Sequence, residues 1–406
     1  MKNSTKNAMF DDLVAYVRQE ELEELLFQLI RIESHQDAPG YERNLVAFIK
    51  GFLEKEKIEV ELQPVLEERA NLIARVRGNG TGPVLVLNGH TDTVPPYEMK
   101  NPFVPCIKDG KIYGRGSVDM KGALAAMMCV LLALKRGGIQ LKGDVVFAAT
   151  IGEENYSPGA YRLVTSGFHA DYAIVGEPTG MKVGIAHKGV IWGEAVFYGR
   201  SVHGSVPEKG INAIYKASNW IEEIQRSYIP SLKERSHPHL GHPTINIGMI
   251  EGGTRPVIVP NQCTLRFERR LLPGESKESA IQELKEILDK LAKRDPEMSG
   301  EIREMPVFHG VPHGPFESKA DSDLVKVLRR AYQEEFHCDT EPCGLGFWTD
   351  AALFAQIPGI QTVVCGPGDI AQAHSNEEYI EREQLLAAYR IYLKAALNLN
   401  NFKGVK

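Results

Sequence analysis

The chain has 406 residues, of which 43% are hydrophobic and 25% are charged, and its formal net charge is -6 at pH 7. This length predicts two domains or one large elaborated domain, and the composition is ordinary for a soluble globular protein. The acidic balance, without a Lys/Arg-rich block, excludes nucleic acid and anionic membranes as main partners. The first residues contain no apolar run, so we expect no secretory signal.

Cellular location is indicated by the apolar stretches and the cysteines. The most apolar segment, 123–134, is shorter than a membrane span, so we expect no transmembrane helix and no membrane partner. The six cysteines are scattered without a Cys-x-x-Cys pair, as is typical of reduced thiols in a cytosolic protein. We therefore expect a cytoplasmic protein.

The first part of the chain alternates helix-like and strand-like segments. Helical apolar spacing is found in three segments: 20–32, 41–55 and 120–135. Short apolar runs predict three buried strands: 84–87, 145–150 and 172–175. This rhythm indicates an α/β fold with a mostly parallel, mixed sheet flanked by helices.

From about residue 186 the pattern changes to a smaller α+β unit with two layers. Its predicted elements, in chain order, are a strand at 190–197, a helix at 212–225, strands at 244–250 and 264–271, and a helix at 276–292. The chain then returns to the first domain with helices at 322–335, 351–355 and 382–399 and a strand at 361–365. We therefore expect one domain from 1–185 and 299–406, and an inserted domain at 186–298.

Polar side chains that suit chemistry follow the ends of the predicted strands. His90 and Asp92 stand two residues apart after the 84–87 run, so on an extended backbone they share a face. An imidazole with a neighbouring acid suits a metal ligand and the carboxylate that orients it. The pattern is short, so its value depends on the rest of the chain.

Four further segment ends each deliver an acid or a histidine. In chain order these are Asp119 after a glycine-rich turn, the pair Glu153 and Glu154, Glu177, and His374. Each has an ordinary interpretation by itself: Asp119 as the cap of the next helix, the acid pair as a solvated loop, and the histidine as a surface residue.

Together these residues are better explained by a metal site. Open α/β sheets bind ligands where their strands end, and five ends here supply two imidazoles and several carboxylates. Such a set suits two divalent ions with a bridging carboxylate. Zinc is the first choice, with Co2+ and Mn2+ as alternatives.

The same order of residues resembles the M20 metallopeptidase family, which includes acetylornithine deacetylase and succinyl-diaminopimelate desuccinylase. The resemblance covers roughly residues 20 to 395. It implies that His90 and Glu177 bind one zinc, that Glu154 and His374 bind the other, and that Asp119 bridges the two. It also implies that Asp92 orients the His90 imidazole without binding metal itself, and that Glu153 is the general base for a hydroxide that bridges the metals.

The resemblance extends to the inserted domain, which corresponds to the family's lid and dimerisation domain. It implies that His203 acts across a homodimer and that Arg270 binds the substrate carboxylate, while Arg269 faces the other side of its strand. Val257 stands where the family commonly has an Asn, which puts that substrate contact in doubt, and Arg255 is the candidate to replace it.

The function implied by the resemblance is hydrolysis of the amide bond of a small N-acyl amino acid, as in the deacetylases and desuccinylases. A dipeptidase or a glutamate carboxypeptidase-type exopeptidase is the alternative. A non-catalytic binding protein on the same scaffold is a remote one, because no position of the metal site is lost.

Overall fold

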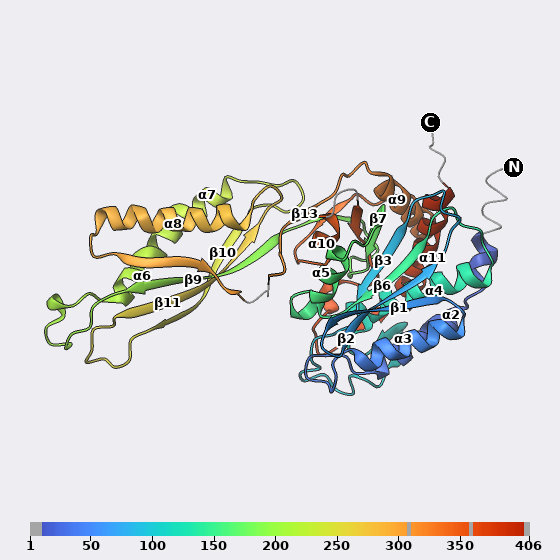
Figure 1. Ribbon diagram of the computed structural model, residues 1–406, viewed down its shortest axis with the longest axis horizontal. Helices are drawn as coiled ribbons and strands as arrows, with labels where there is room; N and C mark the ends of the chain where they lie inside the picture. The colour runs from blue at the N-terminus through green and yellow to red at the C-terminus, as the bar shows by residue number, and fades with distance from the viewer. Residues whose placement is uncertain (1–9, 307–309, 357–359, 402–406) are drawn as a thin grey trace. The chain divides into compact units, whose positions relative to one another are not determined.

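The computed structural model describes residues 10–306, 310–356 and 360–401 (Figure 1). The chain forms two compact units. The first contains Met1–Ile185, Ser318–Cys343 and Thr349–Lys406, and the second contains Ala186–Glu317 and Gly344–Trp348. The second unit extends beyond the expected limit at 298, because the strand Ser299–Glu304 pairs with Gly189–Tyr198 inside it.

The first unit is built on a mixed sheet, which confirms the predicted fold class. Its strands follow one another in the spatial order β1 (Glu59–Leu66), β2 (Arg69–Val76), β6 (Val145–Thr150), β3 (Leu85–His90), β7 (Tyr172–Val175), β15 (Gln361–Val364) and β8 (Gly184–His187). The four strands from β6 to β15 are parallel, and the strands on either side are antiparallel. The short strands β13 (Phe316–Glu317) and β14 (Cys343–Leu345) pair with β8.

Helices cover both faces of this sheet (Figure 1). On one face, Leu85 and Leu87 share a core with the helices α2 (Gln19–Arg31), α3 (Arg43–Lys55), α4 (Gly122–Arg136), α9 (Asp323–Phe336) and α11 (Arg382–Asn401). Alternate residues of β3 face the other way. There α10 (Ala351–Ala355) and α5 (Pro158–Thr165) pack against the strands.

The sequence analysis expected a buried helix at 120–135, and the structure has α4 at Gly122–Arg136, directly after the short irregular turn Ser117–Lys121. The segment Ser117–Arg136 has 20 residues and a mean hydropathy of 1.7, so by length and composition it passes the test for a membrane span. All of its most apolar window is buried inside the protein, as expected for the central helix of a folded core.

A small three-stranded sheet, which the sequence did not predict, adjoins α4. It consists of β4 (Cys106–Lys108), β5 (Lys111–Tyr113) and β16 (Tyr379–Glu381), all antiparallel. Strand β16 comes from the C-terminal part of the chain, so this sheet joins two segments that are far apart in sequence.

The second unit has an antiparallel four-stranded sheet with helices packed against it. The strand order is β10 (Thr244–Gly252), β11 (Gln262–Leu271), β9 (Gly189–Tyr198) and β12 (Ser299–Glu304). Three helices accompany it: α6 (Ala213–Glu223), α7 (Ile229–Lys233) and α8 (Lys277–Arg294). Trp220 of α6 is fully buried between the helices and the sheet, beside Phe197 and Phe267.

Candidate metal centre

The carboxyl ends of the parallel strands bring the predicted metal ligands of the first unit together. His90 is the last residue of β3, Glu154 follows the end of β6, and Glu177 follows the end of β7. Asp119 lies just before α4, and His374 lies in the segment between β15 and β16. Residues on three neighbouring strand ends and two connecting segments thus meet at one edge of the sheet.

These five residues form two groups that share one member. The ligand atoms of His90, Asp119 and Glu177 lie within 4.8 Å of one another, and so do those of Asp119, Glu154 and His374. Asp119 Oδ1 is 2.9 Å from His90 Nε2, while its Oδ2 is 3.3 Å from His374 Nε2. A carboxylate that presents one oxygen to each group has the geometry of a bridging ligand.

The charges of the cluster favour a cation. Burial, with the nearby Asp119 charge, raises the pKa of Glu177 well above its ordinary value. Hydrogen bonds to Asp119 and Glu154 raise the pKa of His374 to about 10. Glu177 Oε1 is buried and has no hydrogen-bond partner among the described residues. A divalent cation would offset the crowded negative charges and satisfy this oxygen, so the residues fit such an ion.

Asp92 contacts His90 and also holds the neighbouring turn. The closer partner of His90 Nδ1 is the backbone carbonyl of Asp92, at 2.9 Å, while the Asp92 carboxylate is 3.5 Å away. That carboxylate also accepts hydrogen bonds from the backbone N–H groups of Glu153 and Glu154, at 3.0 and 2.9 Å. Asp92 therefore fixes the turn that carries the two acids.

The turn separates Glu153 from Glu154. Gly152 has φ +74°, a conformation that favours glycine, and a single turn of 3-10 helix follows it. Glu154 Oε1 is 3.0 Å from His374 Nε2, whereas Glu153 belongs to neither ligand group. Burial, with the charge of Glu177, raises the pKa of Glu153 well above its ordinary value.

The alternative interpretation of Asp119 as a helix cap does not describe the structure. The helix α4 begins at Gly122, its N-cap is Lys121, and no side chain caps it. The Asp119 carboxylate contacts the two histidines, as described above.

Sequence reasoning missed two buried acids near the cluster, Asp350 and Glu378. Asp350 is 1% exposed, its Oδ2 accepts a hydrogen bond from Thr150 Oγ1 at 3.2 Å, and its Oδ1 has no partner among the described residues. Burial raises the pKa of Asp350 to about 6, and its charge contributes to the raised pKa values of Glu153 and Glu177. Only its position before a short helix marks it in the sequence.

His203 and Arg270 belong to the second unit. His203 is exposed, and its Nδ1 lies 2.7 Å from Ser205 Oγ. Arg270 makes a bidentate ion pair with Glu268, at 2.8 and 3.2 Å. Arg269 is fully buried, in agreement with its assignment to the other side of the strand.

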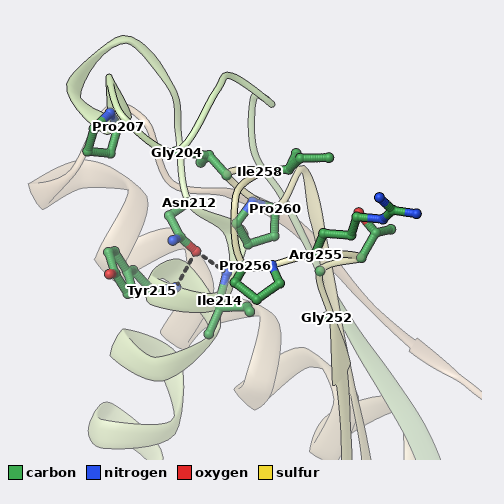
Figure 2. A pocket seen from close by; sticks show the side chains of 13 residues that line it. Gly204, Pro207, Asn212, Ile214, Tyr215, Gly252, Arg255, Pro256, Ile258 and Pro260 are labelled. Atoms are coloured by element: carbon green, nitrogen blue, oxygen red, sulfur yellow. Dashed lines mark hydrogen bonds between the residues drawn. The ribbon is translucent and has the colours of Figure 1, made fainter.

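The loop that carries Val257 lines a pocket of about 630 Å³ in the second unit (Figure 2). Val257 is 56% exposed, and its carbonyl accepts a hydrogen bond from Gly204 N, next to His203. Asn212 caps α6 at the pocket by accepting from two backbone N–H groups (Figure 2). Among the residues described as lining the pocket, Arg255 is the only charged one.

An α/β sheet whose parallel strands end on two overlapping groups of imidazoles and carboxylates is typical of metal-dependent enzymes. The model of peptidase family M20/M25/M40 matches residues 86–398. An acetylornithine deacetylase of Myxococcus xanthus is 31% identical over 86% of this chain and 90% of its own length. A probable succinyl-diaminopimelate desuccinylase of Staphylococcus epidermidis is 27% identical over 91% of this chain and 95% of its own length.

Solved structures show the same fold. The aminopeptidase PepT of Bacillus cereus has a TM-score of 0.79 and 24% identity, over 95% of this chain and 99% of its own. The YXEP protein of Bacillus subtilis, described as a dinuclear metal binding peptidase, has a TM-score of 0.73 and 18% identity, with coverage of 95% and 99%. The chain therefore belongs to peptidase family M20/M25/M40, and it is a hydrolytic enzyme.

Proposed function

We propose that the enzyme hydrolyses the amide bond of a small N-acyl amino acid, as an acetylornithine deacetylase or a succinyl-diaminopimelate desuccinylase does. The observation that supports this most is the shared carboxylate of Asp119, which belongs to both ligand groups. Relatives with these two names match most of the chain. Six free cysteines agree with a place in the cytoplasm.

In this proposal His90, Glu177 and Asp119 hold one divalent ion, and Asp119, Glu154 and His374 hold the other. Zinc suits a donor set of imidazoles and carboxylates, and Co2+ and Mn2+ are alternatives. Two bound ions supply Lewis-acid activation of water and of the amide carbonyl.

Glu153 acts as the general base because it lies beside the cluster and outside both ligand groups. Its carboxylate accepts a proton from the attacking water and then donates it to the departing amine. The raised pKa of Glu153 brings it closer to the working pH, which helps both transfers. Asp92 keeps this residue in place through the backbone.

The second unit completes the proposal as a lid that forms a homodimer. Strand β10 is at the edge of its sheet and exposes Met249 and Ile250, at 50% and 56%. An exposed apolar edge strand favours pairing with another chain. His203 then stabilises the oxyanion across the dimer. Arg270 releases Glu268 and binds the substrate carboxylate in its place.

Two substitutions test the division between base and ligand. Glu153→Ala is expected to abolish turnover and to leave two metal ions per chain, because it removes a base and no ligand. Glu154→Ala is expected to lose metal as well. Loss of metal in the first variant refutes the division.

A substrate panel tests the specificity. Release of free amine is measured from N-acetylornithine, N-succinyl-diaminopimelate, other N-acetyl amino acids, dipeptides and a peptide with C-terminal glutamate. Turnover of the N-acyl amino acids supports the proposal, whereas turnover of the peptides alone supports the exopeptidase alternative. Full activity without metal refutes both.

A further inference from the structure

Glu378 is a buried acid that holds a segment of the metal centre without belonging to either ligand group. It is 1% exposed, and its carboxylate accepts four hydrogen bonds. The donors are Arg115 Nη1 at 2.6 Å and the backbone N–H groups of Gly116, Val118 and Asp119 at 2.9, 3.0 and 3.1 Å. The residues that lead up to Asp119, the ligand shared by both groups, therefore surround this carboxylate.

The small sheet explains why Glu378 lies there. Strand β16 pairs with β5 so that Tyr379 lies opposite Tyr113. Because the pair is antiparallel, the residue before β16 lies beside the residues that follow β5. Gly114 N donates to the Glu378 carbonyl at 3.2 Å, which continues the pairing by one step.

The same segment also carries a metal ligand, since His374 precedes Glu378 by four residues in the chain. One carboxylate thus connects the segment with His374 to the segment with Asp119. Both residues belong to the second ligand group, whose ligand atoms lie within 4.8 Å of one another. The spacing between two ligands of that group depends on how these segments are joined.

We propose that Glu378 is a positioning residue that sets the Asp119 segment in its metal-binding conformation before any metal binds. Its oxygens are engaged with one guanidinium and three backbone amides, so it holds the segment and does not act as a ligand. Because the inference rests on the proposed metal centre, its test must separate a weakened centre from an absent one.

The first test measures Co2+ affinity with Glu378→Gln, in full-length protein stripped by a chelator and followed by visible absorption. The amide keeps the size of the side chain, but its NH2 group faces N–H donors in place of an acceptor. The expected loss is about 10- to 100-fold in affinity, as for other residues that orient metal ligands without binding the metal themselves.

A matched control is Glu23→Gln. Glu23 is also a buried acid of the first unit, 7% exposed, and it accepts two hydrogen bonds from Arg382 at 2.7 and 3.0 Å. Neither residue is a predicted ligand. Both substitutions are expected to lower the melting temperature, but only Glu378→Gln is expected to weaken Co2+ binding.

The second test uses the unchanged protein, so it remains decisive if Glu378→Gln does not fold. In metal-free protein, the amides of Gly116, Val118 and Asp119 are expected to exchange hydrogen more slowly than those of the exposed turn at Asp109 and Gly110. Protection that arises only after Co2+ is added overturns the proposal, because metal would then be ordering the segment.

The remaining outcomes are also decisive. Wild-type affinity in folded Glu378→Gln, or an equal loss in Glu23→Gln, overturns the positioning role and leaves the metal centre standing. Wild-type protein that binds no Co2+ refutes the metal centre, and the role of Glu378 falls with it.

Discussion

The substitution Asp92→Asn tests how the general base is held. The Asp92 side chain is 2% exposed, and its two oxygens each accept one backbone N–H, from Glu153 and Glu154. An asparagine has the same shape but only one acceptor oxygen. One of the two N–H groups therefore loses its partner and faces an NH2 group.

The size of the effect follows from that single bond. A hydrogen bond to a charged group contributes about 1.5–3 kcal/mol, and a buried donor left unpaired costs a similar amount. If this free energy is lost in the transition state, where Glu153 must be in position, kcat falls by about 10- to 100-fold, at about 1.4 kcal/mol for each factor of ten. KM is expected to change little, because the substrate does not contact Asp92 in the proposed mechanism.

The assay measures kcat, KM and bound metal for Asp92→Asn with the best substrate of the panel. Asp171→Asn is the control, because Asp171 Oδ2 accepts the N–H of Val84, at 2.8 Å, before the start of β3 and away from the site. It is expected to affect stability and not kcat. Unchanged kcat in Asp92→Asn refutes the positioning role, and loss of metal shows that Asp92 acts on the ions.

Four further predictions concern packing, protons and the dimer. Gly366→Ala would put Cβ 2.5 Å from the Glu177 carbonyl oxygen, so we expect a loss of about 1–3 kcal/mol in the free energy of unfolding and weaker metal binding. The control is Gly51→Ala in α3, where no atom lies within 4 Å and alanine is expected to stabilise the helix by about 0.5–1 kcal/mol; equal melting curves for the two variants refute the argument. Because the pKa values of Glu177 and His374 are raised, metal binding at pH 7 is expected to release protons and to tighten as pH rises toward about 10; calorimetry in two buffers of different ionisation enthalpy measures this, and no proton release contradicts it. The raised pKa of His374 also stabilises the fold of the metal-free protein. This contribution is fully present below pH 6.5, the ordinary pKa of histidine, and unfolding experiments should show its loss as the pH rises through about 10. Mixing His203→Ala chains with chains that lack the base should restore activity if His203 acts across a dimer, and the absence of any rescue rejects that role.

The sequence predicted the parts of the fold and site that depend on local patterns. The apolar runs identified the parallel strands, and such strands place their carboxyl ends at one edge of the sheet. That rule favoured a common site for His90, Glu154 and Glu177; Asp119 and His374 were expected there as well, and the structure brings all five together. Their roles as ligands stay predictions.

What the sequence did not reveal depends on contacts between distant segments. The three-stranded sheet joins Tyr113 to Tyr379, and short three-residue strands leave almost no periodic signal. Glu378 has donors more than 250 residues away in the chain, and its own neighbours suggest only a polar loop. The hydrogen bonds from the backbone of Glu153 and Glu154 to the Asp92 carboxylate were not foreseen, because the pattern His-x-Asp says nothing about residues 153 and 154.

Counting donors separates the acids of this site into two kinds. Asp92 and Glu378 accept backbone N–H groups with their carboxylates, which leaves them little capacity to bind a metal. Glu177 has an oxygen with no donor among the described residues, and the donor to Glu154 is an imidazole that is itself a predicted ligand. In the proposed metal centre the first kind fixes the segments and the second kind binds the cation. Backbone amides cannot rotate away as side chains do, so this arrangement holds the ligands in place before metal binds. It predicts that substitutions of Asp92 and Glu378 change the metal affinity, whereas substitutions of Glu154 and Glu177 decide whether metal binds at all.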